Sequence, residues 1–199
     1  MKKINQELIA LFDKYGSDRR RALRENKKLS YLYALADLRE NLLDWFQFDP
    51  EQQALQIGAY AGALTGLLAR RLSSVTVLDV SEENLEVVRR RFKTEPELAA
   101  KIRYVCADVE TYAREAEKRG GTYGYVVLIG DLTAADRAGR AAQMTAAKQL
   151  LSAHGTLIAA ASNWFGVKYM AGAERETGAL SWNEMKQLLP GGEFYYPMP

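Results

Sequence analysis

From Pro50 onward the sequence alternates short apolar runs with stretches of helical periodicity, and this alternation limits the fold more than any other feature. The apolar runs predict strands at residues 54–57, 75–80, 102–107, 125–129 and 156–161. The periodic stretches between them predict helices at residues 64–71, 82–92, 109–118 and 134–151. Strands that alternate with helices predict an α/β fold, in which helices cover both faces of a doubly wound, mostly parallel sheet.

A helical pattern precedes this alternation. It covers residues 4–48, with a break at Gly16 and an end before Pro50. Four apolar side chains at helical spacing predict one buried face in its second part: Leu35, Leu38, Leu42 and Trp45. Because no linker separates the two parts, we expect residues 1–49 to form a helical cap in the same domain as residues 50–199.

The end of the chain carries two further signals. Residues 181–189 read as a helix that opens with Ser181 and Glu184 at capping-box spacing, and residues 193–197 read as a last strand. A sheet that stops there exposes unpaired backbone groups near strand 156–161. We therefore expect either a piece of a longer protein, with C-terminal strands missing, or a homodimer that covers this edge.

Composition narrows the class of protein. Hydrophobic residues make up 48% of the 199 residues and charged residues 26%, which is ordinary for a soluble globular chain. A single cysteine cannot form an internal disulfide, and no stretch resembles a signal peptide or a membrane span of ~20 apolar residues. We therefore expect a cytoplasmic protein that does not insert into a membrane.

The charge balance bears on nucleic-acid binding. Lys and Arg number 27 against 25 Asp and Glu, so the net charge is only +2. The basic residues within 19–28 are the best nucleic-acid signal, but Asp18 and Glu25 interrupt them and a solvated helix face explains them better. We do not expect a nucleic-acid partner.

A glycine turn follows the first predicted strand. Gly58 and Gly62 leave room for a ligand to approach the backbone, at the sheet edge where open α/β folds bind ligands. Asp79 ends the second strand about 20 residues later, where an acid holds the hydroxyl pair of a ribose in nucleotide-binding folds. The alternative is an ordinary strand-to-helix turn with a surface aspartate.

The other strand ends reach the same edge. Asp108 follows the third strand and could accept a hydrogen bond from an adenine amino group, and Gly130 and Asp131 follow the fourth. Asp131 is a candidate base, or equally a helix N-cap. The loop at residues 162–173 follows the fifth strand and is rich in polar and aromatic groups.

Five segments, in this order and spacing, resemble the motifs of class I S-adenosylmethionine-dependent methyltransferases: LQIGAYAGALTG, VTVLDVSEEN, YVCADVET, YVVLIGDL and LLSAHGTLIAA. The likeness covers about residues 42–161 and implies a Rossmann-like fold. A narrower likeness is to bacterial methyltransferases linked with surface-polysaccharide glycosyltransferases, and it rests on LRENLLDWFQFDP, SNWFGVKYMAGA and FYYPMP.

The resemblance implies S-adenosyl-L-methionine as cofactor and a small-molecule or saccharide hydroxyl or amine as acceptor. The implied cofactor-binding residues are Gln56, Gly58, Ala59, Tyr60, Gly62, Asp79, Val80, Asp108, Val109 and Gly130. Asp131 and Asn163 are the candidate catalytic residues, and Asn163, Lys168 and Tyr169 are the candidate acceptor contacts. An RNA methyltransferase is the alternative enzyme.

Two positions depart from the family pattern. Gln56 replaces the usual acid and brings no charge to the methionine ammonium. Tyr60 replaces the middle glycine, yet catechol-type O-methyltransferases also carry a Gly-x-Tyr-x-Gly turn, so its ring is expected along the cofactor or in the acceptor pocket. NAD is excluded because its pyrophosphate needs glycine at position 60. A cofactor-binding module without turnover is a further alternative.

The catechol-type enzymes hold a metal with two aspartates and an asparagine. Asp131 and Asn163 fall near two of those places, but Ser162 falls near the third. Because one carboxylate is missing, a hard divalent cation would be poorly held. We expect no metal site and metal-independent methyl transfer.

Overall fold

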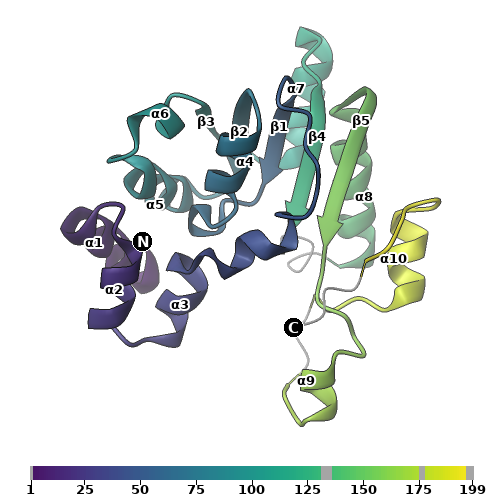
Figure 1. The fold of residues 1–199 in the computed structure, drawn as a ribbon. Helices are drawn as coiled ribbons and strands as arrows, with labels where there is room; N and C mark the ends of the chain where they lie inside the picture. The colour runs from purple at the N-terminus through teal and green to yellow at the C-terminus, as the bar shows by residue number, and fades with distance from the viewer. Residues whose placement is uncertain (1, 131–135, 175–177, 196–199) are drawn as a thin grey trace.

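The computed structural model describes residues 2–130, 136–174 and 178–195. Its centre is a five-stranded parallel sheet in the order β3-β2-β1-β4-β5 (Figure 1). The strands are β1 (Gln53–Ile57), β2 (Ser74–Asp79), β3 (Ile102–Cys106), β4 (Tyr123–Ile129) and β5 (Leu151–Ala160). All five predicted strands are confirmed, although β5 begins earlier than predicted. Strands β1, β2 and β4 are buried without alternation along most of their length because helices cover both faces of the sheet.

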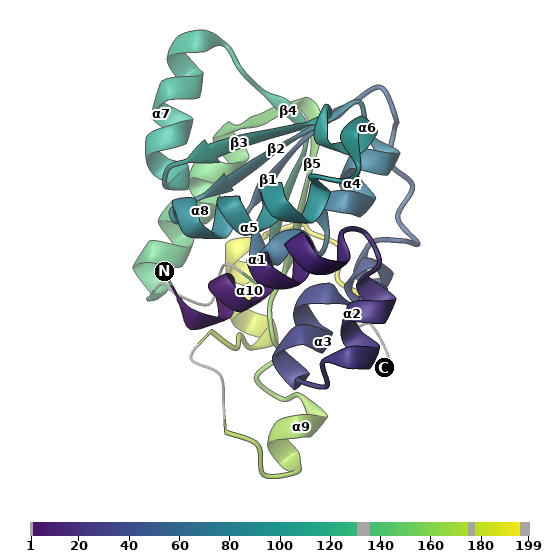
Figure 2. The same ribbon diagram turned by 90° about the vertical axis from the view of Figure 1, so that its left-hand side faces the viewer.

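Helices cover both faces of the sheet, so the doubly wound Rossmann-like fold is confirmed. Helices α4 and α5 contribute to one core cluster, and α7 and α8 contribute to the other. The view along the sheet shows these layers (Figure 2). The helices from β1 onward are α4 (Thr65–Arg71), α5 (Glu82–Phe92), α6 (Pro96–Ala99), α7 (Val109–Arg119), α8 (Arg137–Gln149), α9 (Val167–Met170) and α10 (Trp182–Leu188).

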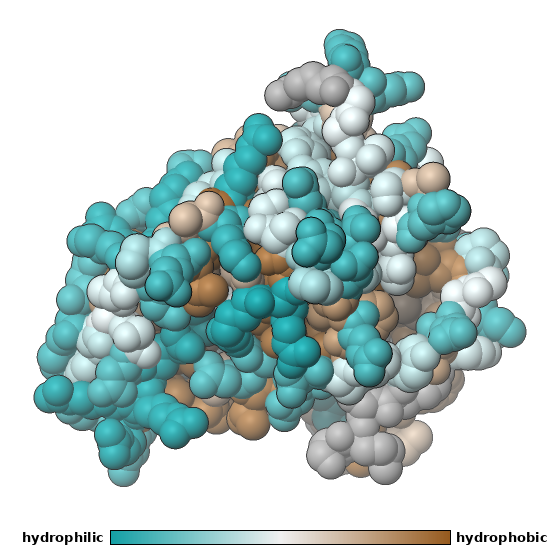
Figure 3. Space-filling model, turned by 45° about the horizontal axis from the view of Figure 1, so that its top comes forward, coloured by the Kyte–Doolittle hydropathy of each residue, from teal (hydrophilic) through white to brown (hydrophobic). Residues whose placement is uncertain are grey.

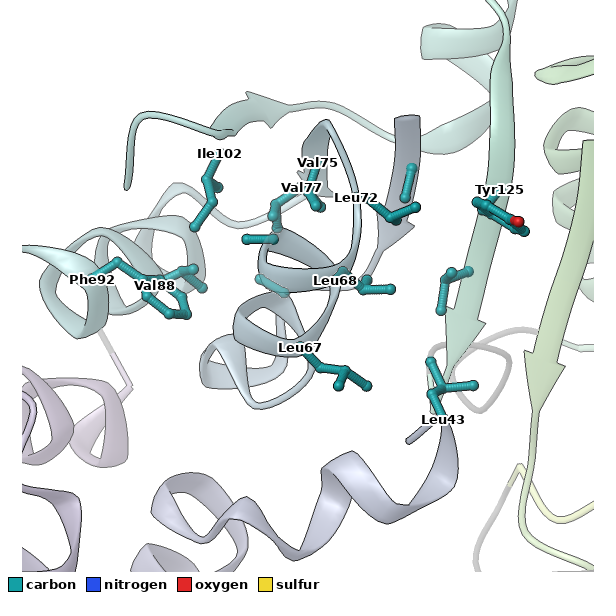
Figure 4. Packing of buried hydrophobic residues seen from close by; sticks show 14 of the residues in the cluster. Leu43, Leu67, Leu68, Leu72, Val75, Val77, Val88, Phe92, Ile102 and Tyr125 are labelled. Carbon is teal, nitrogen blue, oxygen red and sulfur yellow. The ribbon is translucent and has the colours of Figure 1, made fainter. Parts of the chain in front are cut away.

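The first core cluster fixes the helix that follows the glycine turn. Leu67 and Leu68 of α4, and Leu72 directly after it, are almost fully buried against the strands and against Leu43 (Figure 4). Fully burying one leucine side chain contributes about 1.5–3 kcal/mol. This packing holds the start of α4, and with it the turn, at the carboxyl end of β1.

The N-terminal segment forms four short helices: α1 (Lys3–Tyr15), α2 (Arg19–Glu25), α3 (Leu29–Leu35) and the 3₁₀ helix η1 (Asp37–Leu42). The predicted break at Gly16 is confirmed, because Gly16 ends α1 with φ 56°. Asp18 caps α2 by accepting from the Arg21 N–H at 3.0 Å. The cap packs on α5 through an apolar cluster that includes Phe12 and Val87. Whether residues 1–49 belong to the same folding unit as residues 50–199 stays a prediction.

The single apolar helix face predicted across Leu35 and Trp45 is wrong. Ala36 has an extended backbone, with φ −70° and ψ 142°, and this ends α3. The following η1 is a 3₁₀ helix, whose side chains do not repeat with the 3.6-residue period of an α-helix. Leu35 is therefore buried, whereas Leu38 and Trp45 are 67% and 54% exposed.

The C-terminal signals had different outcomes. The capping box of Ser181 and Glu184 is confirmed at the start of α10. The strand predicted at residues 193–197 is wrong over 193–195, and its last two residues lie outside the described part. The aromatic rings pack elsewhere: Phe194 lies 4.4 Å from Trp182, measured between ring centroids. These residues thus make ring contacts and add no sixth strand to the sheet.

Strand β5 lies at one edge of the sheet, and within the described residues it pairs with β4 alone. Pairing of this edge with a second copy stays a prediction. Seen from the amino ends of the strands, the surface is mostly hydrophilic with separate apolar patches (Figure 3). Within the described ranges, no helix combines the length and the apolar character that crossing a membrane requires.

Candidate functional site

The strand order places a topological switch point between β1 and β4. The helices that follow these two strands pack on opposite faces of the sheet, so a crevice opens between the carboxyl ends of the strands. A small pocket of about 10 Å³ lies there, and Arg39, Gln56, Gly58, Tyr60 and Ile129 are among its lining residues. The predicted glycine turn therefore lies where this type of sheet binds ligands.

The turn itself uses unusual backbone conformations. Gly58 and Gly62 have φ values of 84° and 72°, which glycine adopts at no steric cost. Tyr60 and Ala61 also have positive φ, at 33° and 53°, and such conformations cost about 1–2 kcal/mol for residues with a Cβ. The surrounding structure must therefore hold this turn in place.

Helix α5 closes on the turn from one side. A Cβ on Gly62 would lie 3.0 Å from Arg91 Cδ, 3.1 Å from Val88 Cγ1 and 3.2 Å from Phe92 Cε2. Gly62 is thus fixed by its backbone conformation and by contact with α5. Gly62 therefore lets the turn pack closely against α5, besides leaving room for a ligand on the other side.

Arg91 is a buried cation that the sequence analysis missed. Its Nη1 donates to the carbonyl of Ala34 at 2.7 Å and to the carbonyl of Ala61 at 3.1 Å. Burial lowers the pKa of Arg91 to about 10, so the guanidinium is still charged at neutral pH. Arg91 thereby joins the N-terminal cap to the strained part of the turn. An arginine on the inward face of α5, beside Val88 and Phe92, was the available signal.

Asp79 is buried, with 8% of its surface exposed, and it accepts hydrogen bonds from three protein donors. These are the N–H of Ala59 and the N–H of Ser81, both at 2.8 Å, and Asn84 Nδ2 at 3.1 and 3.2 Å. Asn84 Oδ1 accepts in turn from Asn5 Nδ2 at 3.0 Å. The carboxylate therefore connects the turn, α5 and α1, and the sequence analysis missed both asparagines.

Gln56 is a neutral side chain whose amide hydrogen-bonds to the turn. It is 4% exposed. Its Nε2 donates to the carbonyl of Gly58 at 3.0 Å, and its Oε1 accepts from Thr65 Oγ1 at 2.8 Å. Both ends of the amide are thus engaged, one by the turn and one by α4.

Tyr60 projects from the turn and is 52% exposed. The guanidinium of Arg39 lies over its ring, 3.7 Å from the ring centroid, which is a close cation–π contact. Arg39 belongs to η1, so this contact also joins the cap to the turn. Sequence reasoning did not select Arg39 because its partner is 21 residues away.

The remaining predicted cofactor contacts lie along the same edge. Val80 follows β2 and is exposed, and Gly130 follows β4 with φ 84°. Asp108 is exposed and caps α7 by accepting from the Thr111 N–H at 2.7 Å, which holds the pKa of its carboxyl below the ordinary value. Val109 is buried in the core cluster under α7.

The residues predicted to contact the acceptor are not gathered at the turn. Asp131 lies outside the described residues. Asn163 is exposed, and its Oδ1 accepts from the Phe165 N–H at 3.0 Å. Lys168 and Tyr169 lie on α9, which extends away from the sheet in both ribbon views (Figures 1 and 2). The buried hydroxyl of Tyr169 has no hydrogen-bond partner in the described part of the chain.

In the described ranges, no three His, Cys, Asp or Glu side chains lie close enough together to hold a metal ion. Asp131 is outside those ranges, so metal independence stays a prediction. Ser162 is half-buried, and its carbonyl accepts from the Leu180 N–H at 2.8 Å.

A larger cavity of about 410 Å³ lies at the opposite edge of the sheet, near the amino ends of the strands. Its buried hydroxyls bond one another: Tyr112 pairs with Tyr123, and Tyr123 donates to Thr76 at 3.2 Å. It lies away from the switch point and gathers no reactive group there. We therefore place the candidate site at the turn and not in this larger cavity.

A model of a methyltransferase domain matches residues 54–155, which include the turn, Asp79 and Asp108. Among curated proteins, none matches the sequence. The structure is similar to the N-methyltransferase NodS from Bradyrhizobium japonicum WM9, with a TM-score of 0.53 and 18% identity, covering 76% of each chain.

Two other solved structures are similar. The glycopeptide N-methyltransferase MtfA complexed with S-adenosyl-L-methionine has a TM-score of 0.53 and 20% identity, covering 70% of this chain and 57% of that one. A candidate O-methyltransferase from Nostoc punctiforme PCC 73102 has a TM-score of 0.58 and 17% identity, covering 79% and 48%. The chain thus spans about half to three quarters of the length of these relatives, and the likenesses confirm the fold.

Proposed function

The chain belongs to the family of methyltransferase domains, whose methyl donor is S-adenosyl-L-methionine, and we propose that it methylates a hydroxyl or amine on a small molecule or saccharide. The observation that carries the proposal is the turn from Gly58 to Gly62 at the switch point, with Asp79 on the neighbouring strand. Structural relatives crystallised with this cofactor or with S-adenosyl-L-homocysteine support the choice of donor.

The groups at the turn suit the adenosine and methionine parts of this cofactor. Gly58 has no Cβ, so a ligand can approach its backbone closely. The two oxygens of Asp79 offer about four acceptor sites, and the Asn84 amide reaches both of them. When Asn84 turns away, Asp79 can accept from a ribose hydroxyl pair while it keeps its bonds to Ala59 and Ser81.

The other edge residues complete the proposed cofactor contacts. The exposed carboxylate of Asp108 can accept from the adenine amino group, with Val80 and the backbone of Val109 beside the ring. Gly130 leaves room above the carboxyl end of β4. The proposal follows from their shared edge and from their local geometry.

The acceptor chemistry needs positioning and the removal of a proton. The cofactor supplies an activated methyl group on its sulfonium, and the acceptor lone pair must be in line with it. We assign Asp131 to take the acceptor proton and Asn163 to orient the acceptor by a hydrogen bond, with Lys168 and Tyr169 as further contacts. NodS and MtfA are N-methyltransferases, so an amine is included beside a hydroxyl.

Calorimetry with S-adenosyl-L-methionine and S-adenosyl-L-homocysteine tests the cofactor proposal. We expect both to bind at a single site per chain. Transfer of labelled methyl groups to a panel of amines, alcohols and saccharides then separates an enzyme from a binding module. Cofactor binding without transfer to any acceptor of the panel would favour the module, and absence of binding by the folded protein would overturn the proposal.

The RNA alternative receives no support from the basic segment. Arg19 pairs with Asp37 at 3.3 Å and with Glu95 at 3.2 Å, and Arg21 pairs with Glu25 at 2.8 Å. These cations serve the packing of the cap and of α2. Salt-sensitive RNA binding that disappears when residues 19–21 are neutralised would reverse this conclusion. We keep a cytoplasmic location as part of the proposal.

A further inference from the structure

The pocket at the switch point has one charged side chain among its described lining residues, and it is Arg39. Its other lining residues are Gln56, Ile57, Gly58, Tyr60, Ala63, Leu64, Val127 and Ile129. The described lining of the pocket therefore carries a positive charge and no carboxylate. A ligand group that enters it meets a cation beside neutral and apolar atoms.

The acids next to Arg39 in the sequence are committed to other partners. Asp37 pairs with Arg19 at 3.3 Å, and Glu40 pairs with Arg70 at 2.6 Å. Among the described residues no ion pair involves Arg39. Within the described ranges, the group that contacts its guanidinium is the face of the Tyr60 ring, at 3.7 Å from the centroid.

Stacking leaves the hydrogen-bonding groups of Arg39 available. A guanidinium that lies over an aromatic ring uses its flat face, while its N–H donors point outward in its own plane. Two of these donors match the two oxygens of a carboxylate. Tyr60 thus holds Arg39 in a geometry that suits a carboxylate.

Gln56 cannot provide the opposite charge. Its amide is neutral, and both of its ends already bond to Gly58 and Thr65. The amino-acid end of S-adenosylmethionine is a zwitterion with one carboxylate and one ammonium. The lining of the pocket complements the first of these charges and not the second.

We propose that Arg39, stacked on Tyr60, binds the carboxylate of the cofactor and that the pocket distinguishes this carboxylate from the ammonium. The inference rests on the proposed function. Because the pocket has a volume of only about 10 Å³, binding requires Arg39 and Tyr60 to shift outward as a pair. The 52% exposure of Tyr60 leaves room for that shift.

The test removes one charge at a time from the ligand. Calorimetry compares S-adenosyl-L-homocysteine with an analogue that lacks its carboxylate and with one that lacks its ammonium. In the wild-type protein we expect loss of the carboxylate to weaken binding about tenfold or more, as expected for hydrogen bonds to a charged group. Loss of the ammonium should weaken it about threefold at most.

The variants locate the effect. R39Q should weaken binding of S-adenosyl-L-homocysteine about tenfold and remove the penalty for losing the carboxylate. R39K keeps the charge but lacks the paired N–H donors of the guanidinium, so it should retain part of that penalty. Y60F keeps the ring and should therefore keep the penalty for losing the carboxylate, whereas Y60L should lower that penalty. R71Q changes an exposed arginine that pairs with Asp44 and should leave the penalty unchanged.

The outcomes separate the two proposals. If S-adenosyl-L-homocysteine binds but R39Q and wild type show the same carboxylate penalty, Arg39 is not the partner and this inference falls alone. If the ammonium contributes as much as the carboxylate in the wild type, the proposed discrimination is wrong. If the folded wild-type protein binds none of the three ligands, the proposed function falls and takes this inference with it.

Discussion

The two halves of the carboxyl edge of the sheet are built differently. On the β1–β2 side, Gln56 and Asp79 are buried, and protein donors and acceptors engage their polar atoms. On the β4–β5 side, Gly130, Asn163 and Lys168 are exposed, and α9 extends away from the sheet. In the first half, hydrogen bonds within the protein hold Gln56 and Asp79 against the turn, whereas the side chains of the second half are open to solvent.

A glycine-to-alanine substitution in each half should give the largest difference in the free energy of unfolding. Gly62→Ala adds a Cβ at positive φ and forces it against α5, so we expect it to lower the free energy of unfolding by about 3 kcal/mol or more. Gly130→Ala adds a Cβ at φ 84° with no atom of the described residues within 4 Å, so only about 1 kcal/mol should be lost. Urea unfolding of both variants measures the contrast. Equal losses would show that α5 does not confine the turn.

Asp79→Ala should have the next largest effect. It removes the acceptor for Ala59, Ser81 and Asn84, and we expect it to weaken cofactor binding by about 1–3 kcal/mol. The matched control is Asp108→Ala, which removes an exposed helix cap and should change binding less. Calorimetry with S-adenosyl-L-homocysteine measures both. Unchanged affinity in Asp79→Ala would remove this residue from the site.

Sequence reasoning succeeded where the signal was local. The bounds of α5 were predicted without error because Ser81 caps it and Glu82 and Phe92 bracket its periodic residues. The strands were predicted because each contains a short apolar run, and β1, β2 and β4 are buried along most of their length. The turn and Asp79 were found because their spacing along the chain is itself the signal.

The rest depends on contacts between distant segments. Asn5 and Asn84 are 79 residues apart, and Arg91 reaches a carbonyl 57 residues away, so no window of the sequence contains either pair. The extended backbone at Ala36 interrupts a stretch whose apolar residues, from Leu35 to Trp45, have the spacing of one continuous helix. The acceptor side was the least predictable, because its residues lie on loops whose paths the apolar pattern does not specify.

A smaller effect is expected at the N-cap of α7. The N–H of Thr111 holds the pKa of the Asp108 carboxyl below its ordinary value. The charged cap therefore stabilises the fold fully at pH values above the ordinary pKa of an aspartate. This contribution is lost as pH falls through the lowered pKa. Asp108→Asn keeps a capping side chain that does not titrate, so its urea midpoint should fall less than that of wild type between about pH 6 and about pH 2. Parallel curves for the two proteins would contradict the assignment.

The smallest effect is expected from metal removal. Because Ser162 stands near the place of a needed carboxylate, treatment with a chelator should leave methyl transfer unchanged once an acceptor is known. Activity is measured before and after dialysis against the chelator, with added magnesium as the control. Loss of activity that magnesium restores would show that the β4–β5 half assembles a metal site after all.

Because Arg91 donates hydrogen bonds to one carbonyl in the cap and to one in the turn, the stability of each segment depends on the other. One belongs to Ala34 at the end of the cap, and the other belongs to Ala61 in the turn. We predict that a ligand that orders the turn favours docking of the cap, and that docking of the cap then raises the affinity for that ligand by the same factor. On this prediction the N-terminal helices act as an effector of the site, although they belong to the same chain. Slower amide exchange in α3 when the cofactor is bound would report the size of that factor.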